Sequence, residues 1–153
     1  MDIERIAARA LPPDYTLVRV GADGAVRLWT ETVATGFGLP PAVAQLFSPE
    51  VHATDMAPDA STQVFAVIRE RRAVATSLLL LADGLAGIYC VATLQEERGK
   101  GLGAHVTAEA LRAAGRLGYR VGILQSSAMG HSVYKGLGFK DVGGVRMFLR
   151  KPD

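Results

Sequence analysis

Alternating and continuous apolar runs mark four strands in the first two thirds of the chain. Residues 15–20 alternate after a Pro-Pro pair and predict a short first strand. The runs 63–69 and 73–81 are β-type, and the charged turn at 70–72 between them predicts an antiparallel hairpin. Because Asp83-Gly84 tolerates positive φ at both positions, a second hairpin should lead into the next strand.

That next strand, at 85–93, is expected to lie in the centre of the sheet. Its residues 88–91 are continuously apolar, as in strands that are covered on both faces. A short apolar run at 121–125 predicts a parallel partner, reached by a right-handed crossover through a helix. A final run at 145–150 predicts a closing strand.

Apolar residues three or four positions apart predict the helices. One such stripe, which includes Trp29 and Val33, lies within 23–37. A longer stripe at 103–117 ends at Gly118, which is well placed as a C-terminal cap. Two shorter helices are expected, at 41–47 and 132–137.

Together these elements predict an α/β (α+β) fold with a central mixed, mostly antiparallel sheet, flanking helices and one strand-helix-strand unit. The composition agrees with this picture, since 153 residues with 49% hydrophobic and 21% charged positions suit one globular domain. We therefore expect residues 1–153 to form a single domain.

Charge and cysteine content narrow the class of protein. The net charge is +2 and the basic residues are scattered, so neither a nucleic-acid surface nor a membrane surface is indicated. No signal peptide or spanning segment is visible. The single cysteine, Cys90, fits a reducing compartment and reads as a small buried hydrophobe, so the cytoplasm is the expected location.

The segment that carries chemistry is the loop Arg98-Gly99-Lys100-Gly101-Leu102-Gly103, between the central strand and the long helix. Glycines let a ligand approach main-chain N–H groups, and the start of a helix attracts phosphate. Arg98 and Lys100 would add positive charge. A plain packing turn would not need these two cations. A dinucleotide fold is the rival, because Gly99, Gly101 and Ala104 match its glycine pattern, but Gln125 and Ser126 stand where its acidic residue belongs.

These residues resemble the GNAT superfamily of N-acetyltransferases. Arg98, Gly101 and Gly103 match its Q/R-x-x-G-x-G/A signature, and Tyr134 with Gly138-Phe139 matches its downstream Tyr…Gly-Phe element. The resemblance covers roughly residues 87–139. It implies acetyl-CoA as acyl donor, with no metal. The expected cofactor-binding residues are those of the central strand, the loop and the segment before the last helix: Val91, Ala92, Thr93, Arg98, Gly99, Lys100, Gly101, Leu102, Gly103, Ala104 and Ser127.

The resemblance assigns the chemistry to Tyr134, which would protonate the departing thiolate of CoA. A phenol with a reference pKa of about 10 is protonated at neutral pH and suits this role. Ser127 and Gly130 depart from the Asn and Ala that commonly precede the tyrosine. Two roles are equally consistent with the sequence for Ser127: its side chain contacts the pantetheine arm, or it is the N-cap of the helix that follows. No general base can be identified among the candidates Glu31, His52, Asp55, Glu96, Glu97 and His131.

The acceptor substrate is the part of the expected reaction that the sequence determines least. The resemblance places it near the first two helices, which makes residues 36–41 the expected acceptor-side loop, although Trp29 and Phe37 at helical spacing favour core positions. The expected function is N-acetyl transfer from acetyl-CoA to a primary amine of a small molecule, peptide or protein by direct attack. The alternative is a catalytically weak CoA-binding regulatory module. The resemblance also favours a homodimer.

Overall fold

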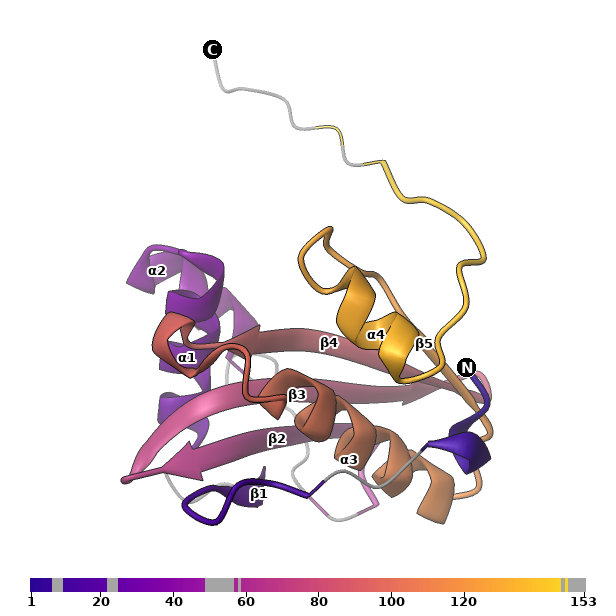
Figure 1. Cartoon of the computed structure of the whole chain (residues 1–153), viewed down its shortest axis with the longest axis horizontal. Helices are drawn as coiled ribbons and strands as arrows, with labels where there is room; N and C mark the ends of the chain where they lie inside the picture. Colours follow the sequence, from indigo (N-terminus) through magenta and orange to yellow (C-terminus); the bar gives the residue numbers. More distant parts are fainter. Residues whose placement is uncertain (7–9, 22–24, 49–56, 58, 147, 149–153) are drawn as a thin grey trace.

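One mixed sheet organises the molecule (Figure 1), and its five strands lie in the order β1-β2-β3-β4-β5. The computed structural model describes residues 1–6, 10–21, 25–48, 57, 59–146 and 148. Neighbouring strands from β1 to β4 are antiparallel, whereas β5 is parallel to β4. The predicted fold class is confirmed. The strands are β1 Thr16–Val20, β2 Thr62–Arg69, β3 Arg72–Ala82, β4 Leu85–Thr93 and β5 Val121–Leu124.

Two tight turns fix the register of the three central strands. Glu70 and Arg71 have φ of 48° and 65°, and Asp83 and Gly84 have φ of 49° and 75°. Positive φ at both central residues is the type I′ geometry, whose twist matches that of the flanking strands. The predicted turn at 70–72 is one residue too long, because Arg72 already pairs with Arg69 at the start of β3.

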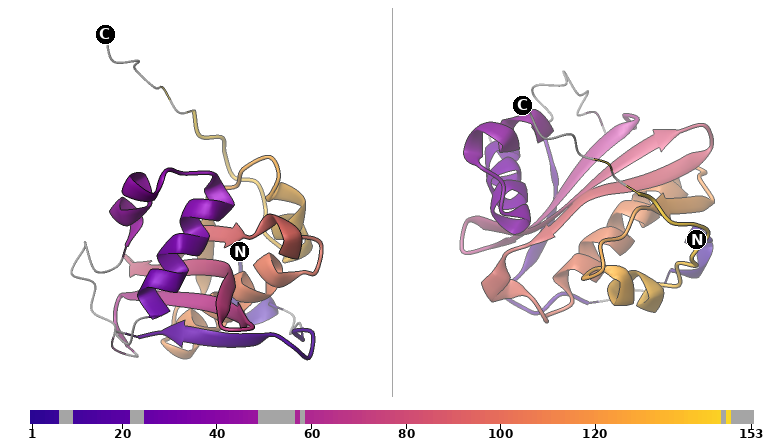
Figure 2. Two further views of the ribbon diagram at one scale, coloured as in Figure 1. Left: turned by 90° about the vertical axis from the view of Figure 1, so that its left-hand side faces the viewer. Right: turned by 90° about the horizontal axis from the view of Figure 1, so that it is seen from above.

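Helices cover the two faces of the sheet, with α1 on one face and α3 on the other (Figure 2). The predicted crossover is present, since α3 connects β4 to the parallel strand β5. No helix among the described residues is both long and apolar enough to cross a bilayer. The α-helices are α1 Ala25–Phe37, α2 Pro41–Ala44, α3 Leu102–Arg116 and α4 His131–Gly136, and the short 3-10 turns are η1 Ile3–Arg5, η2 Gln45–Phe47 and η3 Gln95–Glu97.

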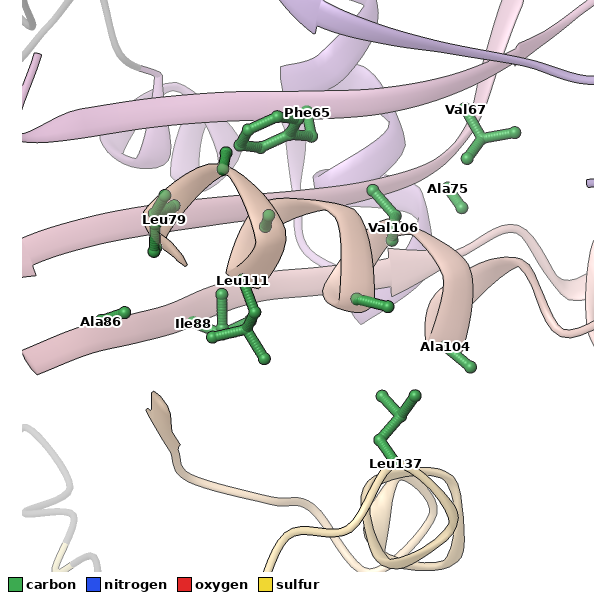
Figure 3. Close-up of a cluster of buried hydrophobic side chains, with 14 of the residues drawn as sticks. Phe65, Val67, Ala75, Leu79, Ala86, Ile88, Ala104, Val106, Leu111 and Leu137 are labelled. Carbon is green, nitrogen blue, oxygen red and sulfur yellow. The ribbon is translucent and has the colours of Figure 1, made fainter. Parts of the chain in front are cut away.

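The larger of two buried clusters lies between α3 and the sheet (Figure 3). Leu111 and Val106 of α3 are fully buried against Leu79 and Ile88 of the central strands. Leu137, next to α4, belongs to the same cluster. This packing holds α4 and the start of α3 in fixed positions around the C-terminal half of β4.

The smaller cluster joins α1 to the other face of the sheet. Trp29 is completely buried there, and its indole Nε1 donates a hydrogen bond to the Ser77 carbonyl at 3.3 Å. Gly36 of α1 lies so close to β4 that a Cβ atom would stand 2.7 Å from the Cβ of Ala92. The end of α1 is therefore held directly beside the end of β4.

The predicted closing strand at 145–150 is wrong for the residues that the structure describes there. Val145, Arg146 and Phe148 are exposed and belong to no strand, while residues 147, 149 and 150 lie outside the described residues. A strand needs a free sheet edge. The outer edge of β5 is partly taken by the N-terminal residues, since Met1 and Gly122 exchange two backbone hydrogen bonds of 2.8 Å.

Candidate active site

The start of α3 presents a set of backbone amides that have no partner within the helix. Gly99 and Gly101 have φ of 79° and 77°, and nothing lies within 4 Å of where a Cβ would stand. The first backbone hydrogen bond into the helix runs from the His105 N–H to the Gly101 carbonyl at 3.0 Å. The N–H groups of residues 102–104 precede that bond and are free to bind an anion at the positive end of the helix dipole.

The edge of β4 is also open next to these amides. Described pairing between β4 and β5 ends at Ile88 and Leu124, whereas β4 continues to Thr93. Within this stretch a bulge sets Cys90 and Val91 opposite the single residue Ser77. Cys90 consequently adopts a φ of 50°, which is unusual for a residue with a side chain. Residues 91–93 of β4 therefore have no described β5 partner, and an extended ligand could pair with this open edge as an added strand.

These two features border one cleft of about 710 Å³. Its lining residues come from the end of α1, the C-terminal half of β4, the loop and start of α3, and α4, and these elements are labelled in Figure 1. Phe37 at the end of α1 is half exposed in this cleft, whereas Trp29 is buried in the core. The predicted core position is therefore confirmed for Trp29 and wrong for Phe37. Of the residues expected from sequence to bind the cofactor or catalyse, all but Lys100 line the cleft: Val91, Ala92, Thr93, Arg98, Gly99, Gly101, Leu102, Gly103, Ala104, Ser127 and Tyr134.

Tyr134 enters the cleft from α4 and is half-buried. Its ring packs edge-to-face on Phe139, with centroids 6.0 Å apart and planes at 72°. Burial raises the pKa of the phenol above its ordinary value. The ring lies so close to Gly130 that a Cβ there would be 2.9 Å from it. An alanine at this position would therefore require the ring of Tyr134 to shift.

Ser127 begins the turn that leads into α4. Its Oγ accepts a hydrogen bond from the Gly130 N–H at 3.2 Å, and its carbonyl accepts one from the His131 N–H at 3.1 Å. The N-cap of α4 is Gly130, so Ser127 is not the N-cap that was one of its two predicted roles, and its Oγ instead closes the turn that precedes the helix. The side chain borders the cleft, as the other predicted role of Ser127, a contact to the ligand, requires.

Lys100 is held away from the cleft by a charged cluster beneath the loop. Its Nζ lies 2.6 Å from Glu97 Oε2 and 3.0 Å from the Tyr15 hydroxyl. Arg69 donates to the other Glu97 oxygen at 3.0 Å, and Tyr15 donates to Oε2 at 2.6 Å. The hydrogen bonds from Lys100 and Tyr15 lower the pKa of the buried Glu97 carboxyl to about 2. Glu97 is therefore a structural anchor of the loop, and Lys100 is its partner.

We expect Glu97→Gln to destabilise the protein in a pH-dependent way. At pH 7 the change should lower the free energy of unfolding by about 1–3 kcal/mol, because the donors Tyr15, Arg69 and Lys100 lose a charged and buried acceptor. Since the folded pKa of Glu97 is depressed, its contribution is complete above the unfolded pKa and declines as pH falls towards about 2. Urea unfolding between pH 7 and pH 2 should show the two proteins converging in acid. A difference that stays constant with pH would contradict this role.

Arg98 ties the loop to both neighbouring elements. Its Nε donates to the Thr93 carbonyl at 3.2 Å, and its Nη2 donates to the Gly36 carbonyl at 3.4 Å. The guanidinium therefore connects the end of β4 to the last turn of α1 at the rim of the cleft. This arrangement supports the local shape of the cleft in addition to contributing positive charge.

None of the described base candidates is an uncommitted group in the cleft. Glu31 pairs with Arg27, Glu96 with Arg72, and His131 with Asp141, while His52 and Asp55 lie outside the described residues. Burial raises the pKa of the Cys90 thiol to about 11, so it is no thiolate nucleophile at neutral pH. Across the described residues there is no cluster of three or more His, Cys, Asp or Glu side chains suited to a metal.

A family model agrees with this site. The acetyltransferase (GNAT) family model matches residues 34–139, which cover the end of α1, the central strands, the loop, α3 and α4. The chain therefore belongs to the GNAT acetyltransferase family, and the predicted enzyme class, an acyltransferase, is confirmed. No curated protein sequence gives a significant match.

Solved structures share the fold at low sequence identity. A GCN5-related N-acetyltransferase from Kribbella flavida is 20% identical with a TM-score of 0.69, over 92% of this chain and 51% of that protein, so the chain spans about half its length. A predicted acetyltransferase from Clostridium acetobutylicum, solved with acetyl-CoA, is 15% identical with a TM-score of 0.72, over 88% and 96% of the two chains. Glucosamine-6-phosphate N-acetyltransferase from Arabidopsis thaliana is 15% identical with a TM-score of 0.65, over 89% and 97%.

Proposed function

We propose that this enzyme transfers an acetyl group from acetyl-CoA to a primary amine by direct attack, with Tyr134 as the general acid. The observation that carries the proposal is the convergence of three features on one cleft: the free amides at the start of α3, the open edge of β4, and the phenol of Tyr134. Family membership supports acetyl-CoA as the donor. The half-buried thiol of Cys90 is compatible with the proposed cytoplasmic location.

The residues present fit coenzyme A. Amides 102–104 and the flanking glycines suit its pyrophosphate, which needs closely approaching N–H donors rather than side chains. The backbone at Val91–Thr93 suits the amides of the pantetheine arm. When bound, acetyl-CoA supplies an activated acyl carbonyl. The chain's own contribution is to hold that carbonyl beside the open side of the cleft, where an amine can reach it.

The role that we propose for Tyr134 is to complete the transfer. A new N–C bond forms as the C–S bond breaks, and the sulfur leaves with an electron pair that must take up a proton. Because burial raises the pKa of Tyr134, the phenol stays protonated at neutral pH and donates that proton. We place the acceptor at the Phe37 end of the cleft, where an exposed aromatic side chain is available for contact.

The amine's own proton is expected to leave to solvent. Among the described cleft residues the only carboxylate is Glu97, which has a pKa of about 2 and is engaged by Lys100 and Arg69. We therefore expect kcat/KM to rise with pH as the neutral fraction of the acceptor grows. The fall at high pH, when Tyr134 ionises, should come above the ordinary range for a phenol, because burial raises the pKa of this side chain.

The pH dependence is checked with two acceptors that differ in amine pKa. The rising limb should move with the pKa of the acceptor, because the acceptor and not the enzyme loses the proton. An inflection at one fixed pH for both acceptors would identify an enzyme base and contradict this account.

The proposed function is tested directly by measuring CoA thiol release with a panel of primary amines. Acceptor-dependent release, with the acetylated amine identified by mass spectrometry, is the expected result. Tight CoA binding without release for any amine would instead favour a CoA-binding regulatory module. The ion pairs of Glu97 with Arg69 and Lys100 are compatible with an enzyme and with a binding module. Turnover, and not CoA binding, therefore decides between these two functions.

A further inference from the structure

The hydroxyl of Tyr15 lies at the centre of the charged cluster beneath the glycine loop. It donates a hydrogen bond to Glu97 Oε2 at 2.6 Å, and it accepts one from Lys100 Nζ at 3.0 Å and one from Arg69 Nη1 at 3.3 Å. The ammonium of Lys100 and the guanidinium of Arg69 also lie over the Tyr15 ring, 5.7 and 5.3 Å from its centroid. Both the donor and the acceptor capacity of this phenol are therefore in use.

The cluster connects the loop to residues that are distant in the sequence. Tyr15 directly precedes β1, and Arg69 is the last residue of β2. Glu97 ends η3, and Lys100 follows it within the loop. The Glu97 side chain, whose carboxylate the three donors share, is only 9% exposed. Charge-assisted hydrogen bonds to a shielded carboxylate are strong, so the cluster attaches the loop firmly to the sheet.

The loop depends on this attachment because its glycines make no side-chain contacts. Lys100 lies between Gly99 and Gly101, which both have positive φ, and nothing lies within 4 Å of where a Cβ would stand on either glycine. Glycine loses more conformational freedom on ordering than any other residue. Arg98 holds the start of the loop through carbonyls of β4 and α1. Lys100 holds its middle, just before the amides of residues 102–104.

Three members of the cluster lie outside the ligand site. Tyr15, Arg69 and Lys100 do not line the cleft, although the glycines on either side of Lys100 do. Glu97 is the member that reaches the cleft, and its carboxylate is already engaged by the three donors. Any effect of Tyr15, Arg69 or Lys100 on a bound ligand is therefore exerted through the loop.

We propose that Tyr15 and Arg69 are positioning residues for coenzyme A binding. They hold Glu97 and Lys100, and through them the loop, so that the amides of residues 102–104 are in place before the pyrophosphate binds. This inference rests on the coenzyme A site of the proposed function. A site that is ordered in advance loses less entropy on binding, so loosening the loop weakens the ligand. Pantetheine, which has no pyrophosphate, binds independently of the cluster.

The test is the dissociation constant of CoA for the Tyr15→Phe variant, measured by isothermal titration. This change keeps the ring beneath the two cations and removes only the hydroxyl. CoA should bind about 10-fold more weakly, a loss equivalent to one hydrogen bond to a charged group. The affinity for pantetheine, measured by competition with CoA, should not change. Arg69→Met removes another donor to Glu97 and should give the same pattern.

Tyr119→Phe is the matched control for these variants. Tyr119, like Tyr15, is partly buried against the α3 cluster and does not line the cleft, but it is not a member of the charged cluster. It should bind CoA as the wild type does. Far-ultraviolet circular dichroism confirms that each variant is folded.

A double-mutant cycle with Lys100→Met separates positioning from direct phosphate contact. Because both changes release the same loop, the double variant with Tyr15→Phe should bind CoA about as weakly as the weaker single variant. Losses that add would identify Lys100 as a phosphate ligand in its own right and overturn the proposal. Unchanged CoA affinity in folded Tyr15→Phe protein, or an equal loss for pantetheine, would also overturn it. A wild-type protein that does not bind CoA would contradict the proposed function itself, and this inference with it.

Discussion

Replacing Tyr134 with phenylalanine is expected to lower kcat for acetyl transfer by about 100-fold, the lower range for loss of a positioned general acid. The ring keeps its edge-to-face packing on Phe139, so the fold and the shape of the cleft should persist. The affinity for acetyl-CoA should consequently stay within a factor of about three, because only the proton donor is removed. Steady-state kinetics together with calorimetric titration of CoA separates these two effects.

Tyr119→Phe is the matched control for this experiment. Tyr119 is also a partly buried tyrosine against the α3 cluster, but it does not line the cleft. Its hydroxyl should therefore be dispensable for turnover. Equal kcat for the Tyr134→Phe variant and the wild type across the pH range would show that another group protonates the sulfur.

Gly103→Leu is expected to weaken acetyl-CoA binding by about 100-fold or more. A Cβ at position 103 would lie 3.4 Å from Thr93 Oγ1 and 3.9 Å from Val91 Cγ1, so a longer side chain would extend between α3 and the open edge of β4. That space is where we place the pantetheine arm. Leucine is a better helix former than glycine, so the helix itself should gain stability.

The Gly103→Leu prediction is measured as the dissociation constant for CoA by isothermal titration. Arg116→Leu places the same side chain on an exposed position at the other end of α3 and should bind CoA normally. Retained affinity in a folded Gly103→Leu variant would mean that the ligand does not pass between α3 and β4.

The order of elements was readable from sequence because local signals determine it. The Asp83-Gly84 turn forms as its sequence requires, and the strand at 85–93 has the predicted bounds. The glycine loop before α3 was also predictable, since the positive φ of Gly99 and Gly101 follows from a sharp strand-to-helix connection. These features depend on residues that are close together in the chain.

The orientation of the Lys100 side chain could not be predicted from local sequence. A lysine between two glycines suggests a phosphate ligand, yet its ammonium pairs with Glu97 and with Tyr15, which lies 85 residues earlier. Arg69 completes that cluster from another strand. Long-range pairing of this kind leaves no local pattern, so sequence reasoning missed both Tyr15 and Arg69.

The prediction of a closing strand at 145–150 was wrong for a related reason. Alternation around Val145 indicates β propensity, but a strand also needs an edge with which to pair, and that depends on what the N-terminal residues occupy. Gly130 is the opposite case. Its departure from the family pattern had no explanation in the sequence, whereas the structure relates it to the ring of Tyr134.

The most direct test of the central claim, that this cleft is a coenzyme A site, is thermal unfolding of the wild-type protein with acetyl-CoA, CoA or NADH. At about 100 times the dissociation constant, a ligand that binds only the folded state adds about 2.7 kcal/mol, which corresponds to roughly 5–10 °C for a chain of this size. We predict such a rise in Tm with both CoA species and none with NADH. A folded protein whose Tm does not change with either CoA species would contradict the account.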